Sequence, residues 1–476
     1  MGSVIAIFGG TGNLAFKKLY ISLYNLYKNN ELEEDFKIIS IGRRSFTNND
    51  FRDLLLGRLI RTSKFKSSED YDSFLNRIFY HKLNFKVEND YISLKKIIDS
   101  DGIDKYKNRV YYLATAPEYF KPICENLDKA DLLSGDIISK AVIEKPFGKD
   151  LADARSINEV LEKYFKEEHI YRTDHYLGKE MIQNILIMRF SNSIFEPMWN
   201  SKYISNVQIN VSESIGIAGR GNYYESAGAL RDMVQSHLLQ ILSLVAMEPP
   251  TSKSTNCIRD EKVKLLKSLK CFDEDDIKNS MVLGQYISNG EDNGYREEID
   301  VSPMSNTETY IALKISIDNE RWKGTNFYIK TGKRLKKKST EVVIEFRNDS
   351  DYILYKGTPN LLKIKIQPEE GMLLSFNLKD PLTNEGIMNR EMEFCQNCLI
   401  NYKSIEAYEK IIVDAIEGDQ SLFARWDELE SSWQFIDKIN GYIQDRHDLL
   451  KFYPALSRGP KESDEMIKKD GFKWWE

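Results

Sequence analysis

A glycine loop near the start of the chain constrains the fold more than any other feature. Gly9-Gly10-Thr11-Gly12-Asn13-Leu14 follows an apolar run at residues 4–8 and leads into a stretch with helical spacing of apolar residues, 14–28. In a strand–loop–helix unit of this kind, glycine lets the backbone approach a pyrophosphate and the helix N-terminus favours its charge. A tight turn without a ligand has the same spacing. The loop predicts a Rossmann-like fold, with Gly9, Gly10, Thr11, Gly12, Asn13 and Leu14 as candidate cofactor-binding residues.

The next apolar run points to the kind of dinucleotide. Residues 37–42 read as a second strand, which ends at Arg43-Arg44. An Asp or Glu at this position recognises a free ribose 2′-hydroxyl, whereas two guanidiniums suit a 2′-phosphate through charge-assisted hydrogen bonds. An ordinary solvated arginine pair is the alternative. Arg43 and Arg44 therefore favour NADP over NAD.

Two different patterns of predicted strands and helices divide the chain into two predicted domains. Over residues 1–174, strands expected at 4–8, 37–42, 109–114 and 137–144 alternate with helices expected at 14–28, 51–59 and 70–79, a pattern typical of a doubly wound parallel sheet. Over residues 175–476, short alternating segments predict a large, mainly antiparallel sheet: 207–212, 310–317, 326–331, 341–346, 361–367 and 372–378. We expect helices at 229–247, 404–417 and 427–439 to flank it, and the last dozen residues to form a loosely held tail. The predicted class is α/β plus α+β, with cofactor binding in the first domain and substrate binding and dimerisation in the second.

Composition excludes several classes of function. The 476 residues carry 67 Lys and Arg against 73 Asp and Glu, a net charge of −6, which argues against a general nucleic-acid or acidic-membrane binder. The basic run 333–338 reads as a solvated face. No apolar stretch approaches the ~18 residues of a membrane helix, and the opening residues lack the basic start of a signal peptide. Five cysteines fit a reducing cytoplasm.

No metal site is predicted. Cys395 and Cys398 have the spacing of half a zinc site, but no second pair follows at metal-binding distance, so we expect two unpaired thiols. Oxidation of a hydroxyl by hydride transfer needs no metal.

Two of the five histidines lie in segments that contain other side chains able to act in catalysis or binding. A base near pH 7 must take the proton when an alcohol donates hydride, and the unperturbed pKa of histidine suits this task. His175 lies in the run 172–179, beside Asp174, Tyr176 and Lys179, and His237 lies in the run 228–240. A buried core histidine is the alternative for His237. On an α-helix Asp232 stands ~140° around from His237, so the carboxylate that orients the imidazole must come from elsewhere, and Asp174 is the candidate.

At this point the sequence resembles the glucose-6-phosphate dehydrogenase family over nearly its whole length. Six blocks occur in the family's order: the glycine loop with Lys18-Leu19-Tyr20, Glu144-Lys-Pro-Phe-Gly148, residues 172–179, residues 228–240 with 246–248, Lys330-Thr-Gly-Lys333, and a set of residues between 408 and 433. Departures from the family pattern fall at Asn13, Phe16, Ile21 and Thr173. Of these, Asn13 and Phe16 bear on cofactor affinity.

The resemblance implies a reaction and a role for each matching residue. D-glucose 6-phosphate and NADP would give 6-phospho-D-glucono-1,5-lactone and NADPH, the first step of the oxidative pentose phosphate pathway. His237 would be the base and Asp174 its partner. The 6-phosphate would be bound by His175, Tyr176 and Lys179, and the sugar by Lys145, Glu213, Asp232 and Lys333, with Lys145 also near the nicotinamide. Lys338 and Gln367 would line the same region, and Pro146 would be a cis proline.

The resemblance also implies a homodimer or homotetramer that associates through the large sheet. Two other functions stay open. One is a cofactor-binding protein without turnover, against which the retention of Asp174, His237 and Lys179 argues. The other is a dehydrogenase that acts on another phosphosugar or uses NAD.

Overall fold

The chain divides into two compact units. The structure, a computed structural model, describes residues 2–32, 35–62, 69–100, 102, 105–270, 274–349, 354–355, 357–383, 386–396, 406–444 and 446–475. One unit comprises Met1–Gly178 and Ile405–Glu430, and the other comprises Lys179–Ser404 and Ser431–Glu476. Among the described residues, no helix combines the length and the apolar character needed to cross a membrane.

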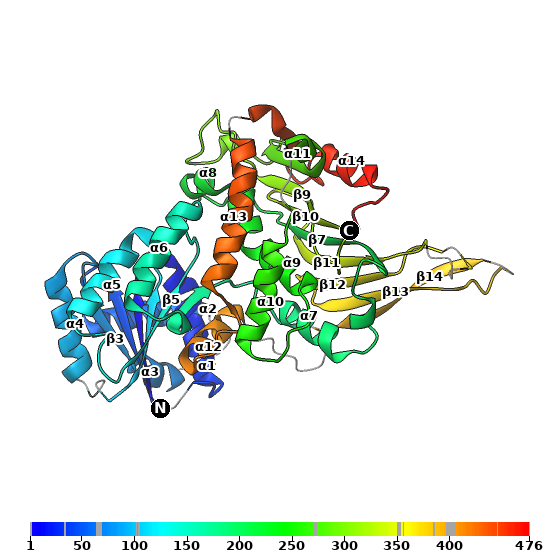
Figure 1. Ribbon diagram of the computed structural model, residues 1–476. Helices are drawn as coiled ribbons and strands as arrows, with labels where there is room; N and C mark the ends of the chain where they lie inside the picture. The colour runs from blue at the N-terminus through cyan, green and yellow to red at the C-terminus, as the bar shows by residue number, and fades with distance from the viewer. Residues whose placement is uncertain are drawn as a thin grey trace. The chain divides into compact units, whose positions relative to one another are not determined.

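The first unit is built on a seven-stranded sheet in the order β15-β6-β5-β4-β1-β2-β3 (Figure 1). All neighbours pair in parallel except β15, which runs antiparallel to β6. The central strands are apolar and buried on both faces, as a sheet covered by helices requires. The strands are β1 (Ser3–Phe8), β2 (Phe36–Gly42), β3 (Ile78–Lys82), β4 (Asn108–Leu113), β5 (Ile138–Ile143), β6 (Ile170–Thr173) and β15 (Phe423–Ala424).

Helices of the first unit surround this sheet and share its core of Ile, Leu, Phe and Tyr side chains. They are η1 (Ala15–Leu19), α1 (Tyr20–Lys28), α2 (Asn48–Thr62), α3 (Glu69–Leu75), α4 (Glu88–Ser100), η2 (Pro117–Tyr119), α5 (Phe120–Lys129), α6 (Leu151–Tyr164), η3 (Glu167–His169) and α12 (Ala407–Glu417). The parallel doubly wound sheet is confirmed. The helix predicted at 70–79 ends earlier, at Leu75, and its last two predicted residues, from Ile78, belong to strand β3.

The helix predicted at 404–417 is also misplaced. Its described part, α12, belongs to the first unit and does not flank the second sheet. The ammonium of Lys140 donates to the carbonyls of Ala415 and Ile416, at 2.9 and 2.6 Å, and Asn25 donates to Glu409 at 2.7 Å. These partners lie more than 270 positions apart in sequence, so a local pattern does not reveal them.

The second unit holds a nine-stranded sheet in the order β14-β13-β12-β11-β7-β10-β9-β8-β16. Pairing is mainly antiparallel, as predicted, but β7 pairs with β10 and β8 with β16 in parallel. The strands are β7 (Ile204–Ser212), β8 (Met281–Ile287), β9 (Tyr310–Ser316), β10 (Asn326–Gly332), β11 (Ser339–Phe346), β12 (Leu361–Gln367), β13 (Gly371–Lys379), β14 (Ile387–Cys395) and β16 (Leu450–Pro454).

Helices of the second unit include the apolar segment α9 (Leu239–Ala246), in which every residue is buried. The others are α7 (Glu180–Ser191), η4 (Glu196–Met198), α8 (Gly221–Ala229), η5 (Leu230–Leu238), α10 (Thr255–Lys267), α11 (Glu274–Ser280), η6 (Tyr295–Glu297), η7 (His447–Leu449) and α14 (Lys461–Lys469). Helix α13 (Trp426–Ile443) contributes residues to both units.

The predicted loose tail is wrong. Residues 461–469 form α14, and the two tryptophans that follow are held by hydrogen bonds. The indole of Trp474 donates to the carbonyl of Ser463 at 3.1 Å, and that of Trp475 donates to the carboxylate of Glu345 at 2.6 Å. The backbone N–H of Trp475 also donates to Gln208 Oε1 on β7, at 3.0 Å. Side chains on β7 and β11 thus fix a segment whose charged sequence suggested mobility.

The prediction of two unpaired thiols is wrong at Cys395, which is disulfide-bonded. Cys398, the other cysteine of that motif, lies outside the described residues. Cys124 and Cys257 are free thiols.

Candidate active site

The glycine loop of the first unit is packed too tightly for side chains at its first two positions. A Cβ on Gly9, whose φ is +88°, would lie 2.4 Å from the carbonyl oxygen of Ala114, and one on Gly10 would lie 2.1 Å from Ser40 Oγ. The N–H groups of Gly9 and Gly10 both donate to the carbonyl of Ile41. These two glycines therefore bring β1 and β2 together at the carboxyl edge of the sheet, where doubly wound folds bind nucleotides.

Arg43 and Arg44 come directly after β2, at the same edge of the sheet. Both side chains are exposed. Tyr80 donates a hydrogen bond to the carbonyl of Arg44 at 2.6 Å and holds the main chain there. Neither guanidinium pairs with a carboxylate of the described residues, so both remain available to an anion.

A buried carboxylate precedes Lys145. Glu144 accepts hydrogen bonds from the hydroxyls of Tyr112, at 2.5 Å, and Thr173, at 3.0 Å. Burial raises the pKa of Glu144 above its ordinary value, against these two donors. Thr173 is one of the positions where the sequence departs from the family pattern, and its hydroxyl helps to fix the segment that carries Lys145. The expected cis peptide at Lys145-Pro146 is present.

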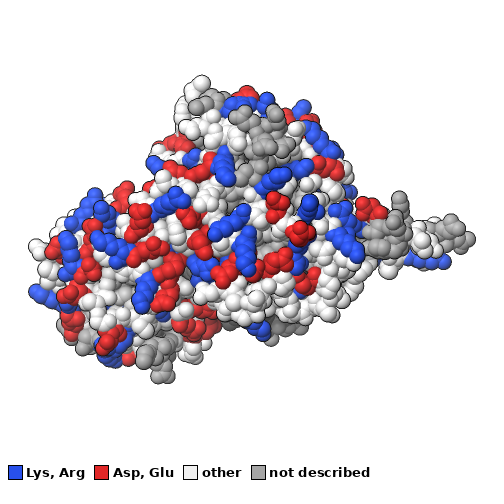
Figure 2. Space-filling model, in the orientation of Figure 1, with Lys and Arg blue, Asp and Glu red and all other residues white. Residues whose placement is uncertain are grey.

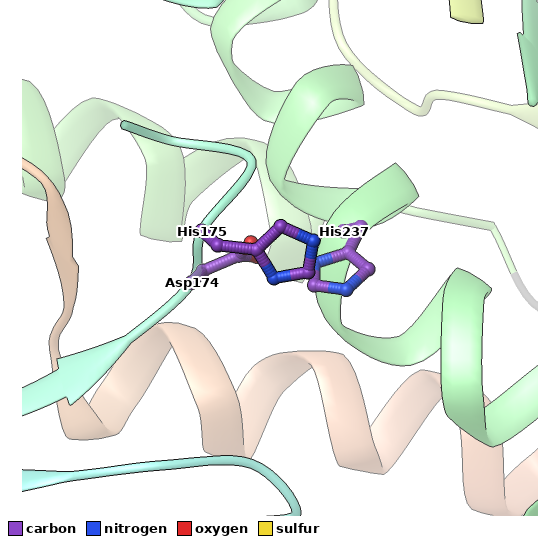
Figure 3. Close-up of side chains that lie close together, drawn as sticks. All are labelled: Asp174, His175 and His237. Atoms are coloured by element: carbon purple, nitrogen blue, oxygen red, sulfur yellow. The ribbon is translucent and has the colours of Figure 1, made fainter. Parts of the chain in front are cut away.

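Asp174 and His175 lie on the short segment that leaves β6, and His237 lies on η5 (Figure 3). Asp174 Oδ1 accepts the backbone N–H of Tyr176 at 2.9 Å, which closes a turn two residues long. The ring of His175 lies 5.0 Å from that of Tyr176, centroid to centroid. The turn thus sets the directions of an acid, an imidazole and a phenol.

In the second unit, a lysine lies between two acids. Ser212 and Gly332 are register partners at the ends of the parallel strands β7 and β10, so the next residues, Glu213 and Lys333, meet at one sheet edge. The ammonium of Lys333 pairs with Glu213 and lies 3.7 Å from Asp232 Oδ2. The side chain of Lys333 is only 4% exposed, so both acids compensate a buried charge. Three predicted sugar-binding residues are thereby brought together.

The helix that carries Asp232 and His237 is not an α-helix. Residues 230–238 form a π-helix, in which Leu239 N–H reaches back five residues to the carbonyl of Val234. Residues five apart in a π-helix follow each other along one side, because the i→i+5 bond closes each turn. The expectation that Asp232 stands ~140° around from His237 is therefore wrong, since it assumed α-helical geometry. Asp232 and His237 project from the same side of η5, and His237 is buried.

Other predicted residues differ in how the structure holds them. The ammonium of Lys179 donates to Gln367 Oε1 at 2.7 Å, and Gln367 Nε2 donates to the hydroxyl of Thr340 at 2.9 Å. This contact joins the start of α7 to the end of β12. Lys338, in contrast, is exposed in the loop before β11 and has no described ion-pair partner.

Two tyrosines next to the predicted residues were missed. Tyr223 donates to Asp232 Oδ1 at 3.1 Å, and the ring of Tyr224 faces the ammonium of Lys333 at 5.5 Å. Desolvation and the nearby Asp232 raise the pKa of Tyr223 well above its ordinary value, so it stays a donor. Their place nine and eight residues before Asp232, on the preceding helix, was the only signal in the sequence.

Surface charge is mixed on one face of the molecule. On the face shown in Figure 2, basic and acidic side chains alternate, and no large region has a single sign.

Comparison with known proteins covers both units. Residues 6–184 match the family model described as glucose-6-phosphate dehydrogenase, NAD binding domain, and residues 186–475 match the model of the C-terminal domain of the same family. Glucose-6-phosphate 1-dehydrogenase of Bacillus subtilis is 43% identical over 486 residues, with 99% of this chain and 98% of the relative covered. The enzyme of Borreliella burgdorferi is also 43% identical, with 98% and 97% covered.

Solved structures agree with the sequences. A glucose-6-phosphate dehydrogenase in complex with its substrate glucose-6-phosphate superposes with a TM-score of 0.93 at 35% identity, with 100% of this chain and 98% of that chain covered. The glucose-6-phosphate 1-dehydrogenase of Mycobacterium avium gives 0.87 at 30% identity over the same shares. Since both domain models match in order and these relatives align from end to end, the chain belongs to the glucose-6-phosphate dehydrogenase family.

Proposed function

We propose that the chain is an NADP-dependent glucose-6-phosphate 1-dehydrogenase, which oxidises D-glucose 6-phosphate to 6-phospho-D-glucono-1,5-lactone in the first step of the oxidative pentose phosphate pathway. The observation that carries the proposal is the group formed by Glu213, Lys333 and Asp232. It would offer a cation and two acids to sugar hydroxyls, and Asp232 stands on the same helix as His237. The family membership of the chain spans both units.

NADP is the cofactor that fits the first unit. The surroundings of Gly9 and Gly10 leave no space for a side chain at either position. Thr11, Asn13 and Leu14 follow, at the start of the first helix. Arg43 and Arg44 are exposed directly after β2. The arginines would hold the 2′-phosphate by bidentate hydrogen bonds. NADP, when bound, accepts the hydride from C1.

His237 is the proposed base. It would take the proton of the C1 hydroxyl as hydride leaves, and Asp174 would orient the imidazole and stabilise its cation. Support comes from the structure of each segment. The turn after β6 points Asp174 in a fixed direction, and η5 presents His237 on the same side as Asp232.

The remaining groups divide between the phosphate and the sugar. His175, Tyr176 and Lys179 would bind the 6-phosphate, because an imidazole, a phenol and an ammonium supply donors to a dianion. Lys145, Glu213, Asp232 and Lys333 would hydrogen-bond the hydroxyls, with Lys145 also close to the nicotinamide. Gln367 would keep Lys179 in place through their hydrogen bond. Lys338 is exposed and has the least structural support for a role in substrate binding.

Association into a homodimer or homotetramer is part of the proposal. Apolar side chains are exposed at one end of the large sheet, at Phe376 and Leu378 on β13 and at Met392 and Phe394 on the edge strand β14. A second copy would remove them from water. We propose the cytoplasm as the location, which the free thiols of Cys124 and Cys257 favour and the disulfide at Cys395 does not.

The test is a rate measurement with purified protein. Glucose 6-phosphate with NADP should give absorbance growth at the NADPH band, faster than with NAD. Galactose 6-phosphate and free glucose, each with both cofactors, separate a related phosphosugar dehydrogenase from the proposed enzyme. Binding of NADP without turnover on any sugar would leave only a cofactor-binding protein.

A further inference from the structure

The helix that carries Asp232 and His237 begins at a break in the chain. Gly228 has φ 61° and ψ 179°, which interrupts the helical path between α8 and η5. The first N–H groups after such a break have no acceptor within their own helix. Here Glu308, from the segment before β9, supplies two: its carbonyl accepts from Ala229 N at 2.9 Å and its Oε1 accepts from Leu230 N at 3.0 Å.

The break and the cap fit each other sterically. A Cβ on Gly228 would lie 2.2 Å from Oε1 of Glu308, so the carboxylate occupies the space that glycine leaves open. A negative charge at a helix N-terminus is favourable, which adds to the hydrogen bonds. Burial raises the pKa of Glu308, while the N–H of Leu230 and the nearby Arg231 act in the opposite direction.

The capped position is close to the proposed chemistry. Asp232 is the third residue of η5, and its carboxylate must stay within reach of Lys333 and Tyr223. His237 follows on the same side of the helix. A shift of about 1 Å in a group that orients substrate costs as much as 10²-fold in rate, so the start of η5 needs a fixed anchor.

We propose that Glu308 is a positioning residue: by capping η5 beside Gly228, it sets where Asp232 and His237 stand toward C1 of the sugar. The functional half of this inference rests on the proposed function. The structural half, that Glu308 anchors the start of η5, does not.

Hydrogen exchange tests the anchor without any turnover. Glu308→Ala removes the carboxylate and keeps the backbone carbonyl that accepts from Ala229 N, so the amides of residues 230–233 should exchange faster than in the parent. Glu308→Gln, which keeps an acceptor oxygen, should restore protection. Glu297 is the matched control, because its carboxylate accepts from Gly294 N at 2.9 Å and caps η6 in the same unit. Glu297→Ala should leave residues 230–233 unchanged. Parent-like exchange in Glu308→Ala would overturn the anchor.

Kinetics test the positioning. Glu308→Ala should lower kcat by about tenfold or more, with the KM for NADP within about twofold, since hydride transfer loses alignment while the first unit is untouched. The deuterium isotope effect with C1-deuterated glucose 6-phosphate should rise as that step becomes more limiting, and Glu308→Gln should recover most of kcat. If Glu308→Ala keeps the parent values of kcat and of the isotope effect, or if Glu297→Ala lowers kcat equally, the positioning role of Glu308 is overturned. If the parent protein shows no turnover, the proposed function is refuted. Hydrogen exchange would still test whether Glu308 anchors the start of η5.

Discussion

Lys333 is held between two carboxylates, with its ammonium 3.7 Å from Asp232 Oδ2 and paired with Glu213 on the other side. Residues 213 and 333 are neighbours because β7 and β10 run parallel and end in register. The two carboxylates compensate the buried ammonium, and in the proposed site the three groups would be offered to sugar hydroxyls.

Lys333→Met is expected to lower both stability and substrate affinity. Loss of the ammonium leaves two acids facing each other, and breaking a largely buried ion pair costs about 3 kcal/mol. Thermal unfolding and the KM for glucose 6-phosphate measure the two effects. Lys337→Met is the control, since that side chain is exposed, has no assigned role and should change neither quantity.

His237→Asn is expected to lower kcat by about 10²- to 10⁴-fold, because it removes the proposed base for the hydroxyl proton. The KM for glucose 6-phosphate should stay near the parent value, since a base contributes more to the transition state than to binding. His169→Asn, at a half-buried histidine without an assigned role, should keep parent turnover. Parent-like turnover in His237→Asn would place the base elsewhere.

Replacing both Arg43 and Arg44 by Ala is expected to abolish the preference for NADP. Each charge-assisted hydrogen bond to the 2′-phosphate contributes about 1.5–3 kcal/mol, so kcat/KM for NADP should fall by tens-fold or more. The value for NAD should change little, because NAD lacks that phosphate. An equal loss with both cofactors would mean that the arginines support the fold of this edge and do not read the phosphate.

Asp414 is expected to destabilise the protein as pH rises. Burial, with repulsion from Asp419, raises the pKa of Asp414 to about 7, whereas in the unfolded chain it is near 3.9. The folded state therefore binds more protons between these two values, and its stability falls as pH rises through about 7.

Asp414→Asn should remove that dependence. Above pH 8 the variant should be more stable than the parent, by on the order of 2 kcal/mol, and the difference should vanish below pH 4. Unfolding at several pH values checks this. Asp419→Asn should give a smaller effect of the same sign, because it relieves only the repulsion. A constant difference at all pH values would mean that Asp414 does not titrate in this range.

Much of the first unit was predictable, because its signals are local. The glycine loop, the strand ending at Arg43 and the alternation of strands and helices each depend on short stretches. The boundary between α3 and β3 was lost because the apolar residues around Ile78 fit both a helix and a strand.

The candidate site was predictable residue by residue only through the family resemblance, and its geometry was not. Sequence spacing placed Asp232 on a different side of the helix from His237, and the π-helical turn of η5 reversed this. Nothing near Glu308 in the sequence marks it as the cap of that helix, because its partners lie 78 and 79 positions earlier.

The sequence by itself determined where a dinucleotide fold begins, which cofactor it favours and which residue types carry the chemistry. Each of these signals is a short motif of neighbouring residues. Only the tertiary structure decided that Glu213, Asp232 and Lys333 share one group, that α12 joins the first unit and that Trp475 is held by Glu345. These contacts join residues 100 or more positions apart, and their energy comes from strand register and burial that no local pattern contains.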